Sequence, residues 1–366
     1  MATPSQEQDT PKLYSQHGLT RWYIDTRSLT LRTTSLPLLG TLQPSEQESV
    51  QHFYHLADRH MSLASNLLKY LFIHQTCRVP WSQIVISRTP APHKRPCYIP
   101  VQRGDDDKVT NIEFNVSHQA SMVALAGCIL PSDAVIPVSL RSGMPNPSSN
   151  PKPSPDSGRV PSLTSPTDTP QIGIDITCTN ERERKNKDSI PKTEAELHDF
   201  IEIFQEVFSA REIADMKRPI SPSGTGKGTG NTLTRSINAR LRRFYTYWAL
   251  KEAYIKMTGE ALLAPWLREL EFLDVVAPEP PKDHDDGFGE PYTGTRILLH
   301  GREVEDVRME VVALGEGYLF ATAARGEGVG RKDGQGDVDL WGDFREVDIE
   351  RDVAPCARGK CQCLAT

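Results

Sequence analysis

The sequence predicts an α+β fold made of two similar halves, and three features support this prediction. Strand-like and helical segments follow one another in a similar order on each side of residues 131–170. That segment holds ten prolines and nine serines without a periodic apolar pattern, so it cannot bury enough surface to order itself. A chain of 366 residues is long enough for two ordinary domains. We expect halves at 13–130 and 171–325, a disordered insertion between them, and a cleft where the halves meet.

The N-terminal half is predicted as strand, helix, strand and strand. Residues 51–75 place leucines at helical spacing on one side, which predicts a single long helix. Residues 84–87 (IVIS) and 112–117 (IEFNVS) alternate between apolar and polar side chains, as half-buried strands do. The apolar run at 121–127 (SMVALAG) is typical of a buried strand.

The C-terminal half repeats a similar plan. Residues 171–177 (QIGIDIT) alternate as a strand, and residues 194–208 have the pattern of a helix. Ser209 and Glu212 form the capping-box signature of a further helix start. A long apolar helix is predicted around 243–259. Three strands are expected after it, at 296–301 (RILLHG), 307–314 (VRMEVVAL) and 318–324 (YLFATAA).

Composition excludes several classes of function. A net charge of −6 and a pI of about 6.0 give no basic field for nucleic acid. The longest apolar run has nine residues, too few to span a bilayer, and the first ten residues show no secretory leader. Seven scattered cysteines fit a reducing compartment, so we expect a cytoplasmic protein without a membrane partner.

The end of the chain, CARGKCQCLAT, crowds three of the cysteines together. Cys361 and Cys363 are spaced closely enough to bind a metal or to be acylated, but no histidine is near them in the sequence. We therefore expect residues 326–366 to form a flexible tail.

The helix around 243–259 carries charges beside an apolar stripe. Phe244, Trp248 and Ile255 share one side of the helix, and Glu252 and Lys256 lie within and beside that stripe. An exposed Glu–Lys pair four residues apart would stabilise the helix by only about 0.2–0.5 kcal/mol. Burying a carboxylate is costly unless it is paired or binds a metal. The apolar surroundings therefore favour a functional role for Glu252.

Two predicted strands carry further polar candidates. In QIGIDIT the three isoleucines face one way, whereas Asp175 and Thr177 share the other face. Gly173 leaves space beside Asp175 for another group to approach, although a solvent-facing aspartate would give the same pattern. Ser117 and His118 close the strand at 112–117, and adjacent strand residues point apart. That geometry opposes a nucleophile–base pair and favours contacts with a phosphate or a base.

Four motifs together resemble a known family. The segments NVSHQASMVALAG, GIDIT, FSAREI and WALKEAYIKMTGEAL occur in order within about residues 50–325. They resemble the 4′-phosphopantetheinyl transferases of the surfactin-synthetase-activating (Sfp) type, and the last motif is the most specific. The Pro/Ser-rich insertion and the opening RWYIDTRSLT are similar to the fungal, broad-range branch. The resemblance implies a pseudo-dimeric α+β fold that binds coenzyme A and Mg²⁺ in the cleft between its halves.

The resemblance assigns roles to five residues of the motifs. Glu252 matches a helix carboxylate that serves as metal ligand and base, and Asp175 matches a strand carboxylate that binds the same metal. Lys256 matches the lysine that contacts the phosphates of the coenzyme. Ser117 and His118 match the coenzyme-contacting Ser-His pair.

Outside the motifs the correspondence is looser. Arg95, before Pro96, falls where the family has a basic residue near the adenine nucleotide, and Arg88 aligns less securely. The family commonly has a glutamate where this chain has Thr177. A basic segment that often grips the 3′-phosphate is replaced by EQESVQH. Three other basic residues are candidates for that role: Arg59, His60 and Lys69.

The implied reaction is transfer of phosphopantetheine from coenzyme A to a serine of an acyl or peptidyl carrier protein. By resemblance, the carriers belong to polyketide synthases, nonribosomal peptide synthetases, fatty acid synthase and aminoadipate reductase. Two alternatives stay open: a non-catalytic carrier-binding protein, and a Mg²⁺-dependent coenzyme A pyrophosphohydrolase. Two halves in one chain predict a monomer. The apolar residues Phe208, Ile213 and Met216 of the segment 207–216 are expected either to dock the carrier or to belong to the core.

Overall fold

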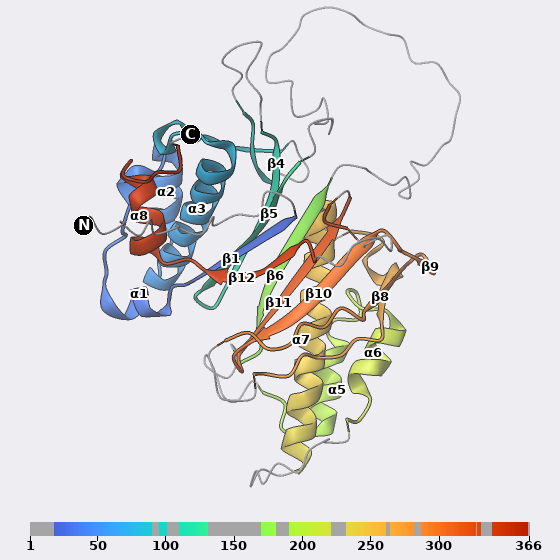
Figure 1. Ribbon diagram of the computed structural model, residues 1–366. Helices are drawn as coiled ribbons and strands as arrows, with labels where there is room; N and C mark the ends of the chain where they lie inside the picture. The colour runs from blue at the N-terminus through green and yellow to red at the C-terminus, as the bar shows by residue number, and fades with distance from the viewer. Residues whose placement is uncertain are drawn as a thin grey trace, which may run out of the picture.

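The computed structural model describes most of both halves and the end of the chain. The described residues are 18–89, 95–100, 110–130, 170–180, 190–220, 232–260, 264–281, 287–326, 328–330 and 339–364. The insertion predicted at 131–170 lies outside them, apart from Pro170. The described residues form a mixed α/β structure with several sheets, in which each half packs a long helix against a sheet (Figure 1).

The N-terminal half is a sheet with the order β12-β1-β5-β4, in which β12 (Trp341–Glu346) comes from the end of the chain, and helix α3 covers this sheet (Figure 1). Alternation along β1 and β5 sends one set of side chains toward α3, where Trp22, Val123 and Leu125 pack with its leucines. The elements of this half are β1 (Leu19–Asp25), α1 (Arg27–Arg32), η1 (Leu39–Thr41), α2 (Pro44–His52), α3 (Leu56–Cys77), η2 (Trp81–Gln83), β2 (Ile86–Arg88), β3 (Pro96–Tyr98), β4 (Ile112–Gln119) and β5 (Met122–Ile129).

The single helix predicted for 51–75 is wrong at its start. The chain leaves α2 after His52, because Phe53 and His55 adopt extended backbone angles, and α3 begins at Leu56. No glycine or proline marks this break, and the apolar periodicity continues through it, so the sequence gives no sign that the helix is interrupted.

The C-terminal half contains the sheet β10-β11-β6 with helix α7 against β6 and β11. Gly173 of β6 explains how closely the helix approaches. A Cβ there would lie 2.0 Å from the carbonyl oxygen of Ala253 and 2.4 Å from the amide nitrogen of Met257. The elements of this half are β6 (Gln171–Cys178), α5 (Glu194–Glu202), α6 (Ala210–Lys217), α7 (Thr232–Thr258), η5 (Leu267–Glu269), β7 (Leu270–Leu273), β8 (Arg296–Leu299), β9 (Arg302–Glu303), β10 (Val307–Leu314) and β11 (Tyr318–Arg325).

The two halves share one connectivity. The N-terminal half runs β1, α3, β4, β5 along the chain, with the spatial order β1-β5-β4. The C-terminal half runs β6, α7, β10, β11, with the spatial order β6-β11-β10. In both halves a strand and a long helix are followed by a hairpin, and the second hairpin strand pairs with the first strand of the half.

Edge strands β4 and β6 join the halves through side chains. Three side chains of β4, each two residues from the next, accept hydrogen bonds from backbone amides of β6, so the two strands run in the same direction. The bonds run to Asn115 Oδ1 from Ile174 N (3.1 Å), to Ser117 Oγ from Ile176 N (3.3 Å) and to Gln119 Oε1 from Cys178 N (2.9 Å). These side chains satisfy edge amides that would otherwise lack a partner.

A buried ion pair also links the halves. Arg21 of β1 contacts Glu310 of β10, and each side chain is only 5% exposed. The guanidinium of Arg21 lies 4.4 Å from the centre of the Phe344 ring and donates a hydrogen bond to the carbonyl oxygen of Gly342 (2.7 Å). Burying a charged pair requires such compensation, because each ion loses its hydration.

The flexible tail predicted for 326–366 is wrong for residues 339–364. Strand β12 (Trp341–Glu346) pairs in parallel with β1, and the chain continues through a π-helix, η6 (Ile349–Val353), into α8 (Ala354–Ala357). Trp341 and Val353 are buried, and Val353 joins the core beneath α3. These anchors are spread among charged residues without a regular period, so sequence periodicity does not reveal them.

In the segment 207–216, Phe208 and Met216 belong to the core, and Ile213 is only partly buried against it. Phe208 and Met216 are fully buried, so the carrier-docking interpretation of these two side chains is wrong. The predicted capping box at Ser209 and Glu212 is confirmed. Glu212 also forms a buried ion pair with Lys251 of α7, at 3.0 Å. The lysine that precedes Glu252 in the helix motif therefore has a structural partner.

Candidate active site

Three motifs that are distant in the sequence meet where β4, β6 and α7 come together. The ammonium of Lys256 lies 2.6 Å from Asp175 Oδ1 and donates a hydrogen bond to Ser117 Oγ at 2.9 Å. Ser117 Oγ in turn lies 3.1 Å from Asp175 Oδ1. Asp175 and Ser117 are each 5% exposed. Lys256 therefore pairs with Asp175 and Ser117, and it does not form the exposed surface pair with Glu252 that its spacing also allowed.

Thr177 fixes the orientation of Asp175. Its hydroxyl donates to Asp175 Oδ2 at 2.9 Å, so both oxygens of this carboxylate have partners. The alternation predicted for β6 is confirmed: the isoleucines fill the core between the sheets, and Asp175 and Thr177 face away from it. The group that approaches beside Gly173 is the backbone of α7, which carries Glu252 and Lys256.

Glu252 is half-buried and close enough to Asp175 to be affected by its charge. Burial, and then the negative charge of Asp175, raise the pKa of Glu252 to about 7, although Lys256 acts in the opposite direction. Two carboxylates thus share one ammonium in a poorly hydrated place. An added cation would favour the ionised form of both groups, so the charge balance and the oxygen donors fit a hard divalent ion.

Basic side chains surround His118 at the end of β4. Partial burial and the positive charges of Lys256 and Lys69 lower the pKa of His118, opposed by Asp58. Burial and the neighbouring charge of Arg88 lower the pKa of Lys69 to about 8. Positive charges that lower the pKa of neighbouring basic groups mark a place where a phosphate would bind favourably.

The other two candidates for the 3′-phosphate make structural hydrogen bonds. His60 is fully buried, with hydrogen bonds to the hydroxyl of Thr30 (2.9 Å) and the carbonyl oxygen of Ser35 (3.0 Å). Arg59 donates its Nε to the carbonyl oxygen of Phe53 at 2.7 Å. Lys69 is therefore the best placed of the three.

Arg95 connects the two halves. Its guanidinium pairs with Glu113 of β4 at 2.7 Å and donates to the carbonyl oxygens of Ile172 (3.2 Å) and Met257 (3.4 Å). These contacts tie β4 to β6 and α7, and contact with the adenine nucleotide stays a prediction. Arg88 is exposed at the end of β2.

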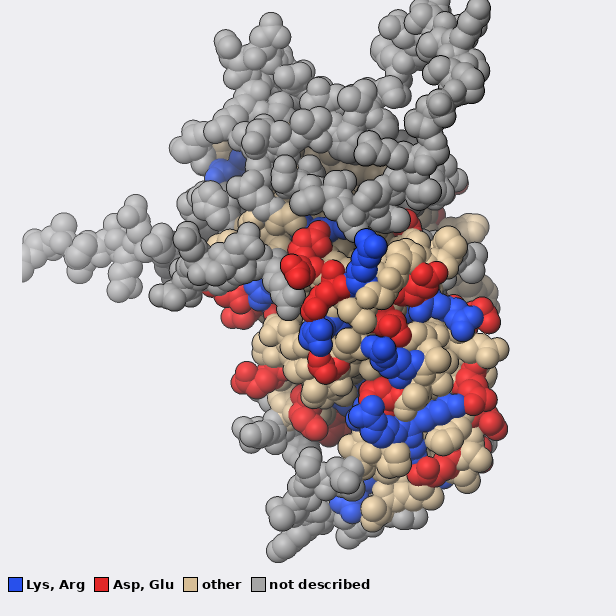
Figure 2. Space-filling model, turned by 90° about the vertical axis from the view of Figure 1, so that its right-hand side faces the viewer, with Lys and Arg blue, Asp and Glu red and all other residues tan. Residues whose placement is uncertain are grey.

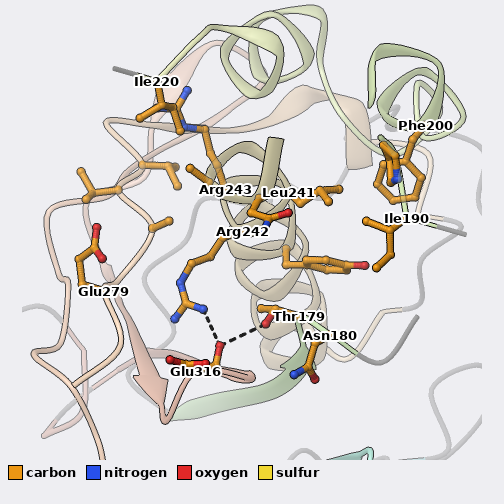
Figure 3. Close-up of a pocket in the computed structure, with 17 residues that line it drawn as sticks. Thr179, Asn180, Ile190, Phe200, Ile220, Leu241, Arg242, Arg243, Glu279 and Glu316 are labelled. Carbon is orange, nitrogen blue, oxygen red and sulfur yellow. Dashed lines mark hydrogen bonds between the residues drawn. The ribbon is translucent and has the colours of Figure 1, made fainter. Parts of the chain in front are cut away.

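One pocket lies along the first part of α7, and sequence analysis did not single it out. Thr179, Asn180, Phe200, Arg242 and Glu279 are among its lining residues (Figure 3). Arg242 donates to the carbonyl oxygens of Glu316 (2.9 Å) and Pro278. This arginine looks like a surface residue in a helical pattern, so only the tertiary fold reveals its position.

The outer face of the C-terminal half mixes both signs of charge. Figure 2 shows lysines and arginines interspersed with aspartates and glutamates on this face, in keeping with the net charge of −6. Among the described residues, no helix has the length and apolar character needed to cross a membrane.

Comparison with known proteins agrees with the motifs. Residues 32–130 match the family model of the 4′-phosphopantetheinyl transferase N-terminal domain, and residues 171–302 match that of the 4′-phosphopantetheinyl transferase superfamily. The chain is 54% identical to 4′-phosphopantetheinyl transferase A of Aspergillus fumigatus, over 94% of this chain and 96% of that protein. It is 51% identical to 4′-phosphopantetheinyl transferase NpgA of Emericella nidulans, over 98% and 99% of the two chains.

A more distant relative is human. The chain is 26% identical to the L-aminoadipate-semialdehyde dehydrogenase-phosphopantetheinyl transferase of Homo sapiens, over 80% of this chain and 70% of that protein. The fungal identities extend over nearly the whole chain and include both halves and the helix motif. The chain therefore belongs to the 4′-phosphopantetheinyl transferase family, and it is a transferase that attaches the phosphopantetheine of coenzyme A to carrier proteins.

Proposed function

We propose that the transfer takes place where β4, β6 and α7 meet, with Asp175, Glu252 and Lys256 as its central groups. The observation that carries this proposal is the contact of Lys256 with Asp175, at 2.6 Å, beside a glutamate whose pKa is raised to about 7. A structural ion pair alone would not need a second, poorly compensated carboxylate. Titratable groups perturbed in this way are typical of active sites.

We also propose that the two halves around this site form a pseudo-dimer. The shared connectivity of the halves and the side-chain bonds between β4 and β6 support it. Coenzyme A would bind between the halves, so a single chain would hold the complete site and act as a monomer. Ser117 and His118 come from one half, whereas Asp175, Glu252 and Lys256 come from the other.

Asp175 and Glu252 are the residues that would hold Mg²⁺. Carboxylates and phosphate oxygens are the ligands that this ion prefers, and when bound it supplies positive charge to the pyrophosphate of the coenzyme. Thr177 is neutral and its hydroxyl is bonded to Asp175, so we assign it to positioning that carboxylate.

The chemical step needs a base and charge stabilisation. Glu252, once ionised, would accept the proton of the carrier serine hydroxyl, whose oxygen forms a bond to the β-phosphorus of coenzyme A. The bond from that phosphorus to the bridging oxygen breaks, and 3′,5′-ADP leaves with the electron pair. Lys256 would turn from Asp175 toward the phosphates and stabilise the charge that grows on them.

Ser117, His118 and the basic groups beyond them would bind the coenzyme. Lys69 and Arg88 are assigned to its 3′-phosphate, because their mutual repulsion is relieved by an anion. Arg95 would support the nucleotide side of the site from its position between the halves.

We propose that the carriers belong to polyketide synthases, nonribosomal peptide synthetases, fatty acid synthase and aminoadipate reductase, and that the enzyme works in the cytoplasm. The similarity to fungal transferases over nearly the full chain supports the broad range. The mammalian relatives, whose names include L-aminoadipate-semialdehyde dehydrogenase, support the last carrier.

Mass spectrometry of an apo-carrier incubated with coenzyme A, Mg²⁺ and the enzyme tests this proposal. We expect the carrier to gain one phosphopantetheine, and a carrier with its acceptor serine replaced by alanine to gain none. Free phosphopantetheine beside an unmodified carrier would indicate a pyrophosphohydrolase. A bound but unmodified carrier with intact coenzyme A would indicate a non-catalytic binding protein.

A further inference from the structure

Four potential metal ligands that are not part of the candidate active site motifs meet between helix α3 and the end of the chain. They are His74 of α3 and Cys356, Cys361 and Cys363 of the C-terminal segment, and their ligand atoms all lie within 4.8 Å of one another. His74 and Cys356 are buried, at 1% and 2% exposed. No histidine is close to these cysteines in the sequence, but the fold brings one to them, because α8 packs the C-terminal segment against α3, which carries His74.

The distances match a tetrahedral zinc site. With a Zn–S distance of about 2.3 Å, two sulfur ligands lie about 3.8 Å apart. The sulfurs of Cys356 and Cys363 are 3.7 Å apart. His74 Nε2 and Cys361 Sγ are 3.1 Å apart, so a zinc ion needs this pair to separate by about half an ångström. Three cysteines and one histidine are a common ligand set of closed, structural zinc sites.

The hydrogen bonding of His74 leaves Nε2, the nitrogen that faces the cysteines, available to bind a metal. Its Nδ1 lies 2.7 Å from the carbonyl oxygen of Val79, and a carbonyl can only accept, so Nδ1 carries the hydrogen. Nε2 then presents its lone pair toward Cys361. Metal-binding histidines are typically oriented by such a second hydrogen bond. The guanidinium of Arg78 donates to the carbonyl oxygen of Cys363, which places a positive charge beside a centre of net charge −1.

The same geometry argues against a disulfide. A disulfide requires an S–S distance of about 2.05 Å, and it would leave one of the three cysteines unused. All seven cysteines of the chain are free thiols in the structure. Acylation is also disfavoured, because Cys361 points at a buried histidine.

We propose that His74, Cys356, Cys361 and Cys363 bind one Zn²⁺ ion in a structural site that fastens the C-terminal segment to α3. Strand β12 would then be held along its length by its pairing with β1, and beyond its C-terminal end by the zinc-bound segment. This role is separate from phosphopantetheine transfer, and its test needs no activity measurement.

The first experiment measures the metal content of the full-length enzyme, purified without chelators, by inductively coupled plasma mass spectrometry. We expect about one zinc per chain in the wild type. The double variant Cys361→Ser/Cys363→Ser should lose it. Cys77→Ser should retain it, because Cys77 ends the same helix but lies outside the cluster. A wild-type enzyme without zinc that also fails to take up added Zn²⁺ or Co²⁺ would overturn the proposal.

The second experiment uses the wild type alone, so it does not depend on the folding of a variant. A zinc-selective chelator that spares Mg²⁺ should expose three additional thiols to alkylation and lower the melting temperature. Added Zn²⁺ should reverse both effects, and Co²⁺ should give the visible spectrum of a tetrahedral thiolate site. Two thiols that become reactive only after reduction would show a disulfide instead. Alkylation unaffected by the chelator would contradict the zinc site.

Discussion

Lys69 shows at the residue scale how burial prepares a side chain for an anion. Its ammonium is half-buried and close to Arg88, and its pKa is lowered to about 8. A phosphate beside it would restore the ordinary preference for the charged form. The sequence offered Lys69 only as one of three basic residues, because burial and the approach of β2 depend on the fold. His60 is also a basic residue, but both of its ring nitrogens make structural hydrogen bonds.

We predict that binding of coenzyme A takes up a proton near pH 8. Free Lys69 is about half protonated there, and the bound phosphate raises its pKa, so the complex holds more protons than the free enzyme. Calorimetry in two buffers of different ionisation heat measures this uptake. Lys69→Arg keeps the positive charge and should remove the uptake. An equal uptake in that variant would show that another group is responsible.

Glu252 leads to a prediction about pH. Its pKa of about 7 means that the base is half protonated at neutral pH, and only the ionised form accepts a proton. At limiting Mg²⁺, kcat/KM for coenzyme A should therefore rise with pH around a midpoint near 7. Higher Mg²⁺ should move the midpoint to lower pH, because a cation favours the carboxylate. Glu252→Gln should lose about 10²–10⁴-fold in rate. If the pH midpoint did not change with Mg²⁺ concentration, the group that titrates would not be a ligand of the metal.

Elements with a clear period were predicted well from the sequence. The alternation in QIGIDIT correctly placed the isoleucines in the core and Asp175 on the opposite face. The break before Leu56 and the ordered residues 339–364 were missed, since both depend on contacts between remote parts of the chain. Lys251 lies in the same apolar helix as Glu252, and its partner Glu212 could not be identified without the fold.

At the scale of elements, Gly173 sets the distance between β6 and α7. We predict that Gly173→Ala destabilises the protein by about 1–3 kcal/mol or more, because its Cβ would meet backbone atoms of Ala253 and Met257 that cannot move independently. Displacing α7 also displaces Glu252 and Lys256, so kcat should fall in the folded fraction. Urea unfolding and kinetics measure both effects. Gly40→Ala is the control, since a Cβ there meets nothing within 4 Å. If Gly173→Ala were as stable as Gly40→Ala, α7 would not approach β6 as closely as described.

At the scale of the whole molecule, buried polar contacts join the halves that each supply part of the site. Side chains of β4 bond to β6, and Arg21 of the first half pairs with Glu310 of the second. The division into halves could be predicted from repeated order in the sequence. The joining contacts could not, because an arginine in one strand and a glutamate in another give no sign that they will meet.

Removing one member of the Arg21–Glu310 pair should be costly. Arg21→Met leaves the buried Glu310 with only the more distant Arg308, 3.7 Å from its Oε2, as a counter-charge, and we expect a loss of about 3 kcal/mol in the free energy of unfolding. The double variant Arg21→Met/Glu310→Leu should recover much of that loss, because an apolar pair has no desolvation cost. Chemical denaturation of the wild type, Arg21→Met, Glu310→Leu and the double variant gives the coupling energy between the two side chains. Additive effects of the two substitutions would contradict a direct pair.

The central claim is that Asp175 and Glu252 together form a metal-dependent site with Thr177 in a supporting role. Its most direct test is the transfer rate, as phosphopantetheine gained by an apo-carrier, measured against Mg²⁺ concentration for Asp175→Ala, Glu252→Gln and Thr177→Ala. We predict that both carboxylate variants are nearly inactive at every Mg²⁺ concentration, because one anionic protein ligand remains. Thr177→Ala, which loses only a hydrogen bond to Asp175, should be reduced by about tenfold or less. A Thr177→Ala enzyme as damaged as the carboxylate variants, or a carboxylate variant with normal Mg²⁺ dependence, would contradict the account.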